Sequence, residues 1–154
     1  MKIIPNGGVG APARYHALNA LTTLTDDPKS RNIVLNTPNL YDIILEQLSS
    51  QFVTMKLRAA TLLMSFYIGN YTKECLFLLT AEMVTSLIEC SKLTEREIMD
   101  NFTDEGEFQG MVFLPINILD SGNLPYALKM FVIPMYYQTC LDVIGYVFMH
   151  FAGL

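Results

Sequence analysis

Apolar residues along this chain recur at the spacing of an α-helix rather than at that of a strand. Positions i, i+3, i+4 and i+7 share one helix face, and this spacing predicts helices over about 29–36, 39–50 and 53–67. The alternation typical of strands never persists, and β-branched residues are scattered. The pattern therefore predicts an all-α protein.

The helical pattern repeats along the chain. A stripe in the first helix is formed by Ala17, Ala20, Leu21 and Leu24, and the same stripe returns as Ala59, Leu62, Leu63 and Phe66, at a shift of 42. A second stripe is formed by Leu40, Tyr41, Ile44 and Leu45, and it returns as Met83, Val84, Leu87 and Ile88, at a shift of 43. Since no such helix can cover its apolar stripe alone, the stripes are expected to be covered by stacking of neighbouring repeats.

A third copy is expected at twice the first shift. Residues 118–124 match 34–40, and the apolar stripe that follows consists of Cys140, Val143, Ile144 and Val147. Between the copies, residues 94–109 form an irregular acidic insert, in which we expect a short helix from the N-cap Thr94 to about Phe102 and then an acidic loop. The prediction is one domain, an α-solenoid of about three repeats over residues 12–154, after a flexible leader at 1–11.

The C-terminal segment 130–154 is apolar and long enough to span a bilayer. However, Gln138, Asp142 and Gly145 make a thin polar stripe, and Pro134 interrupts the run. Asp142 in the centre of a membrane would cost about 2.5–3.5 kcal/mol. We therefore expect a largely buried helix of a soluble protein, with a small membrane-associated subunit anchored by 130–154 as the alternative.

Amino-acid composition and charge narrow the class of protein further. Hydrophobic residues make up 51% and charged residues 16%, which excludes a disordered chain. Residues 74–154 hold three basic and eleven acidic side chains, which argues against nucleic-acid binding there. Cys75, Cys90 and Cys140 are widely spaced in apolar runs, so we expect buried free thiols and a reducing compartment.

No pattern in the chain predicts catalysis. The two histidines, His16 and His150, lie far apart, and Gly7-Gly8-Val9-Gly10 lacks the Lys-Ser/Thr of a phosphate loop. Neither a carboxylate pair nor a metal-ligand spacing stands out. We predict no enzyme, no cofactor and no bound metal.

The repeat resembles a known family. Residues 118–128, ILDSGNLPYAL, resemble the armadillo-repeat signature, and RNIVLNTPNLYDIILEQL (31–48) with TMKLRAATLLMSF (54–66) resembles the same repeat in the karyopherin-α and β-catenin families. HEAT repeats are the close alternative. The resemblance implies a right-handed solenoid that binds proteins, in the cytoplasm or nucleus of a eukaryotic cell.

The resemblance also points to groove residues on the third helix of each repeat. Karyopherin-α repeats present a Trp there and an Asn four residues later. The matching positions here are Asn19 and Thr23, Thr61 and Ser65, and Asp142 and Tyr146. Since Trp is missing, binding of a basic nuclear-localisation peptide in the usual manner is not expected. These residues could instead hydrogen-bond the backbone of an extended peptide.

The positions of the repeats indicate what lies at the two ends of the chain. The chain opens on a helix equivalent to the third helix of a repeat, and its last residues, His150 to Leu154, are not a polar cap. Terminal repeats of a solenoid otherwise expose an apolar face. We therefore expect the last helix to dock against a partner, another copy of the chain, or further repeats of a longer array. The predicted function is a non-catalytic interaction scaffold that binds a partner's extended peptide or docking helix.

Overall fold

The computed structural model describes residues 11–67, 75–104, 126 and 128–152, and this part is helical without a strand. The all-α prediction is therefore confirmed for it. The helices are α1 (Ala11–Leu24), α2 (Pro28–Leu35), α3 (Leu40–Leu48), α4 (Val53–Tyr67), the 3-10 turn η1 (Leu76–Leu78), α5 (Ala81–Ser91), α6 (Glu95–Asp104), the π-helical turn η3 (Leu128–Val132) and α9 (Ile133–Phe151). The predicted third-copy segment 118–124 and the leader residues 1–10 lie outside the described residues.

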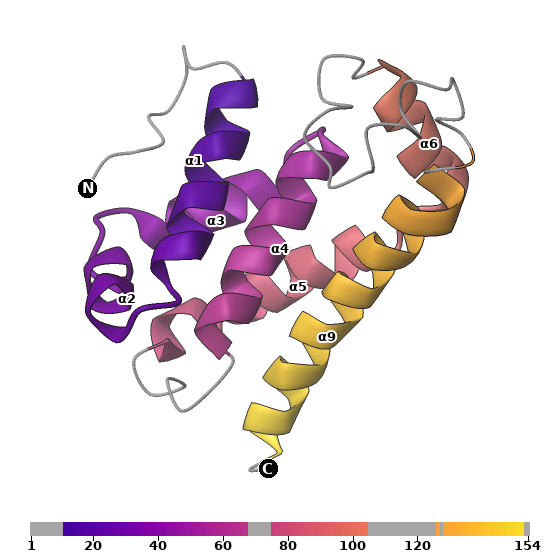
Figure 1. The fold of residues 1–154 in the computed structure, drawn as a ribbon. Helices are drawn as coiled ribbons and strands as arrows, with labels where there is room; N and C mark the ends of the chain where they lie inside the picture. The colour runs from indigo at the N-terminus through magenta and orange to yellow at the C-terminus, as the bar shows by residue number, and fades with distance from the viewer. Residues whose placement is uncertain (1–10, 68–74, 105–125, 127, 153–154) are drawn as a thin grey trace.

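The helices form two layers (Figure 1). Helices α1, α4 and α9 lie side by side in front, and α3 and α5 lie behind them. Helix α4 is the centre of the arrangement, because it packs against α1, α3 and α9. Helix α5 packs against α3 and α9, and α3 packs against α4, so the rear layer links α4 to α9.

Helix α4 has the bounds that the sequence predicts, 53–67, and its predicted apolar stripe is confirmed. Ala59, Leu62, Leu63 and Phe66 are all fully buried. Only Lys56, Thr61, Met64 and Ser65 of this helix are not buried. Burial of nearly the whole circumference fits a helix that has neighbours on three sides.

Helices α3 and α5 bury equivalent positions, as the repeat predicts. Leu40 and Ile44 of α3 are buried, and so are Met83 and Leu87 of α5. The two helices are also joined by polar contacts. The Tyr41 hydroxyl lies 2.6 Å from Thr80 Oγ1, and Cys90 Sγ donates to the Leu48 carbonyl at 3.3 Å.

The predicted stripe of α1 is wrong in register. Leu18, Leu21 and, just after the helix, Thr25 are buried, while Ala20 and Leu24 are exposed. A polar residue can take the last buried position because the Thr25 hydroxyl donates to the Thr22 carbonyl at 2.6 Å. Helix α1 also includes Ala11, which the sequence assigned to the leader.

Local capping fixes where several helices begin. Asp27 caps α2 by accepting a hydrogen bond from the Ser30 N–H at 3.0 Å. Thr94 Oγ1 accepts from the Glu97 N–H at 3.1 Å, and a Glu97 carboxylate oxygen accepts from the Thr94 N–H at 3.1 Å. This reciprocal pair is a capping box and confirms the predicted start of α6. The helix extends to Asp104, beyond the predicted end near Phe102.

Asn101 of α6 links this helix to the start of α4. Its Oδ1 accepts from the Val53 N–H at 2.8 Å, and its Nδ2 donates to the Gln51 carbonyl at 2.7 Å. One side chain from a distant segment thus satisfies two backbone groups at a helix end, where such groups otherwise lack partners. Asn101 therefore connects the acidic segment to the centre of the fold.

Candidate protein-binding surfaces

The six groove candidates lie on three helices of the front layer, two on each. Asn19 and Thr23 are on α1, Thr61 and Ser65 on α4, and Asp142 and Tyr146 on α9. Thr23, Asp142 and Tyr146 are exposed, and the other three are half-buried. Thr61 and Ser65 belong to the small part of α4 that its neighbours leave open.

The hydroxyl groups of these candidates bond within their own helices. Thr23 Oγ1 donates to the Asn19 carbonyl at 3.1 Å, and Thr61 Oγ1 donates to the Leu57 carbonyl at 2.8 Å. Ser65 Oγ donates to the Leu62 carbonyl at 2.6 Å. Their oxygens can still accept a hydrogen bond from a ligand.

The candidate pair on α9, Asp142 and Tyr146, has no hydrogen bond to the candidate pairs on α1 and α4 among the described residues. Asp142 Oδ1 accepts from Gln138 Nε2 at 2.7 Å, within the polar stripe that the sequence predicts. Among the described residues no hydrogen bond joins one pair of candidates to another. The structure thus places the six along neighbouring helices without assembling them into one polar cluster.

The apolar face of α9 is wider than the surface that covers it. Its inner side is buried against α4 and α5 and consists of Tyr136, Cys140, Val143 and Val147. Beside it runs a second apolar row, here called the outer stripe, formed by Tyr137, Leu141, Ile144, Phe148 and Phe151. In this row Leu141 is 57% exposed, Phe148 58% and Phe151 64%, while Tyr137 and Ile144 are half-buried.

Two tyrosines fix α9 against the end of α5. The Tyr136 hydroxyl donates to the Cys90 carbonyl at 2.7 Å, and the Tyr137 hydroxyl donates to the Leu93 carbonyl. Burial raises the pKa of Tyr136, and the neighbouring Cys90 and Cys140 raise it further. Burial also raises the pKa of Tyr137, with a further contribution from the negative charges of Glu95 and Glu97. These contacts place the start of the outer stripe beside the acidic first turn of α6.

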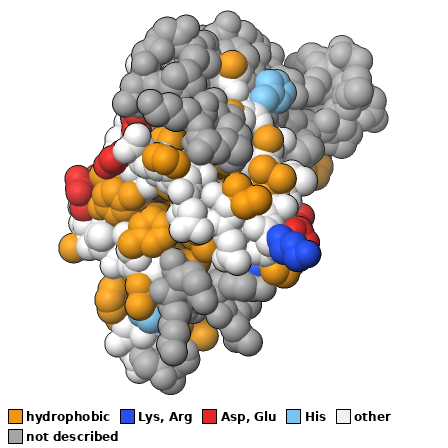
Figure 2. Space-filling model, turned by 90° about the vertical axis from the view of Figure 1, so that its left-hand side faces the viewer, with side chains coloured by type: hydrophobic (Ala, Val, Ile, Leu, Met, Phe, Trp, Pro, Cys, Tyr) orange, Lys and Arg blue, Asp and Glu red, His pale blue; other side chains and the backbone are white. Residues whose placement is uncertain are grey.

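A second apolar surface lies on the α1–α2 side of the molecule. Figure 2 shows hydrophobic side chains gathered in the middle of this side, with charged side chains towards its edges. The exposed apolar residues of α1, α2 and η1 include Leu24, Ile33, Leu76 and Phe77. They come from three separate elements, whereas the outer stripe lies on one helix.

The groups suited to covalent or metal chemistry are dispersed or buried. Cys75, Cys90 and Cys140 are buried, as the sequence predicts. Burial raises the pKa of the Cys140 thiol to about 12. Within the described ranges no group of three or more His, Cys, Asp or Glu side chains is placed to hold a metal ion.

Comparison with protein-family models, with curated proteins and with solved structures gives no match for this chain. The armadillo resemblance and the function that it implies therefore stay predictions. What the structure adds is the two-layer packing and the surfaces described above.

Sequence reasoning identified the apolar face of α9 but not its division into a buried and an exposed half. A signal for this was present in the chain. Apolar side chains between 130 and 151 occupy more of the helix circumference than the single stripe that one packed neighbour requires. The sequence assigned Gln138, Asp142 and Gly145 to a polar stripe and Tyr146 to a groove, and it expected the last helix to dock without saying which apolar residues are exposed.

Proposed function

We propose that this protein is a non-catalytic protein–protein interaction module built as a short, right-handed α-solenoid of armadillo type. The observation that carries the proposal is the outer stripe of α9, an apolar row that is exposed beside a tightly packed core. Contiguous exposed apolar surface on a soluble protein commonly marks an interaction site. The partner is a protein, bound at this exposed end or along the front layer.

The packing of the helices supports the repeat interpretation. In a solenoid, equivalent helices of successive repeats stack side by side. Here α1, α4 and α9 stack in the front layer, and α3 and α5 stack behind them with equivalent buried positions. In this interpretation α9 follows α4 directly in the stack.

The front layer offers a second mode of binding, to an extended peptide. Thr61 and Ser65 provide acceptor oxygens on the open part of α4, and Thr23 and Asn19 provide them on the neighbouring α1. A peptide backbone that crosses these helices would donate its N–H groups to them. The missing Trp makes this mode differ from that of karyopherin-α.

A photo-crosslinking experiment tests the interaction proposal. Benzoylphenylalanine replaces Phe148 in the full chain expressed in cells, and a matched variant carries it at Ile33, which is 63% exposed at the other end of the molecule. The proposal predicts discrete protein adducts from position 148 that are absent from position 33. Adducts to lipid alone at position 148 would contradict it.

The alternative, a membrane-associated subunit, is favoured by one observation. The helical stretch Lys129–Phe151 is long and apolar enough to cross a membrane, and 33% of its most apolar window is buried in the structure. Carbonate extraction of membranes separates the two classes. The interaction module leaves in the supernatant, whereas retention in the pellet would support the membrane anchor and overturn our proposal.

The proposed location is the cytoplasm or the nucleus. Three buried cysteines at wide spacing are typical of a protein from a reducing compartment. The armadillo resemblance favours the same location.

A further inference from the structure

The outer stripe has the spacing of a helix–helix seam. Tyr137, Leu141, Ile144, Phe148 and Phe151 follow one another at alternating intervals of four and three. This is the a/d spacing by which one helix packs along another. At a rise of about 1.5 Å per residue, the row is roughly 21 Å long, which matches a partner helix of about four turns.

Acidic side chains border the stripe at its Tyr137 end. Glu95 and Glu97 are exposed in the first turn of α6, and they lie close enough to Tyr137 to act on its phenol electrostatically. Within the described part of the chain neither carboxylate forms an ion pair. One oxygen of Glu97 is used in the capping box of α6.

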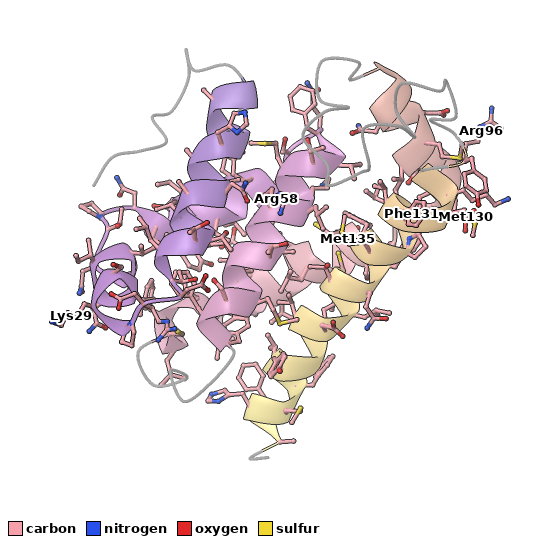
Figure 3. The ribbon with its side chains drawn as sticks, in the orientation of Figure 1. Lys29, Arg58, Arg96, Met130, Phe131 and Met135 are labelled. Atoms are coloured by element: carbon pink, nitrogen blue, oxygen red, sulfur yellow. The ribbon has the colours of Figure 1, made fainter. Side chains whose placement is uncertain are left out.

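The nearby basic side chains do not neutralise these acids. Lys92 pairs with Glu89 at 3.3 Å, and Arg96 lies 3.9 Å from Asp100. Figure 3 shows Arg96 near Met130 and Phe131, where α6 meets η3. Residues 81–104 and 129–152, which build this end of the molecule, carry seven acidic and three basic side chains.

This charge pattern indicates which kind of partner would bind the apolar outer stripe of α9. A second copy of the chain would bring the same excess of acids to the contact, and like charges at an interface oppose association. An anionic membrane surface would be repelled for the same reason. A helix with basic side chains beside its apolar row complements both the shape and the charge.

We propose that the outer stripe of α9 binds an amphipathic helix of a partner protein. The helix carries apolar residues at a/d spacing, and its lysine or arginine residues meet Glu95 and Glu97. This inference rests on the proposed interaction function and specifies the chemistry of the partner.

Two synthetic peptides, each a helix of about five turns, test the proposal. Both carry leucine at the same a and d positions, and they differ only in having lysine or glutamate at the flanking positions. Binding to the full-length chain is followed by fluorescence anisotropy. We expect the lysine peptide to bind about tenfold more tightly than the glutamate peptide, and the difference to shrink at high salt.

Variants of the chain locate the contact. Phe148→Asp and, as a milder change, Phe148→Ser weaken binding of the lysine peptide, with folding checked by circular dichroism. Replacing both acids by glutamine, Glu95→Gln with Glu97→Gln, reduces the preference for lysine over glutamate. Glu46→Gln, an exposed acid on α3, leaves that preference unchanged.

Each contrary outcome has a defined meaning. Equal binding of both peptides, lost in Phe148→Asp, overturns the basic helix but leaves the interaction function standing. A dimer in light scattering that Phe148→Asp converts to monomer assigns the stripe to a second copy and overturns the proposal. Binding to anionic phospholipid vesicles with no binding of either peptide overturns both this proposal and the interaction function.

Discussion

The hydroxyl groups of Tyr136 and Tyr137 on α9 bond to backbone carbonyls at the end of a neighbouring helix and just after it. The last carbonyl groups of a helix lack partners within it. Tyr136 donates to the Cys90 carbonyl at the C-terminal end of α5, and Tyr137 donates to the Leu93 carbonyl two residues beyond that end. The position of α9 is therefore set by directed polar bonds as well as by apolar packing.

Removing one of these bonds should cost measurable stability. Tyr136→Phe keeps the ring but leaves the buried Cys90 carbonyl without this donor. Because the Leu93 N–H still donates to that carbonyl at 3.4 Å, we expect the free energy of unfolding to fall by about 0.5–1.5 kcal/mol. The exposed Tyr126→Phe, by contrast, should change it by less than about 0.5 kcal/mol. Urea denaturation of both variants measures the effect, and equal stabilities would show that the hydroxyl bond contributes nothing.

The buried thiol of Cys140 should make the protein sensitive to alkaline pH. Its pKa rises from 9.0 to about 12 on folding, mainly because of burial and then because of Cys90. The folded state thus keeps a proton that the unfolded state loses, so this contribution to stability is full below pH 9 and is lost as the pH rises towards 12.

Denaturation midpoints at pH 8.5 and 10.5 test this linkage. The wild-type protein should lose more stability between the two pH values than the Cys140→Ala variant does. Parallel losses in the two proteins would assign the alkaline sensitivity to other groups.

At the scale of the helices, the sequence predicted what depends on local pattern. The limits of α4 and the cap at Thr94 followed from helical periodicity and from capping chemistry, which are properties of neighbouring residues. The register of α1 did not follow, because its face is chosen by contact with α4 and because Thr25 can be buried by bonding to Thr22. The exposed candidates on α9 were placed correctly on one helix, but their neighbours in space could not be inferred from spacing alone.

The register of α1 can be tested with two leucines. Leu18 is fully buried, whereas Leu24 is 38% exposed. Leu18→Ala should therefore lower the free energy of unfolding by about 2–5 kcal/mol, and Leu24→Ala by about 1 kcal/mol or less. A larger loss from Leu24→Ala would support the register predicted from the sequence and contradict the structure.

Gly145 in α9 offers a stabilising change. Apart from its chain neighbours and the backbone of its own helix, no heavy atom lies within 4 Å of the place where a Cβ would stand. Glycine inside a helix costs roughly 0.5–1 kcal/mol relative to alanine because its unfolded chain has more freedom. Gly145→Ala should raise the free energy of unfolding by about that amount in thermal or urea denaturation, and a loss of stability would indicate a close neighbour at this point.

At the scale of the whole molecule, the described residues form a two-layer stack in which they cover only one side of α9, the last front helix. Helix α9 packs against both α4 and α5, contacts that join residues far apart in the chain. Such long-range packing is decided by shape complementarity across layers, which the repeat period indicates only in outline. The proposed interaction function depends on α9 having one core side and one open side.

The most direct test compares an acid placed on each side of α9. Val143 is fully buried and Phe148 is 58% exposed on the same helix. We expect Val143→Asp to unfold the protein or to destabilise it severely, because an unpaired charge enters the core. Phe148→Asp should change the free energy of unfolding by no more than about 1 kcal/mol. Equal and severe destabilisation by both variants, measured by urea denaturation, would show that the outer stripe belongs to the core and would overturn its proposed role as an interaction surface.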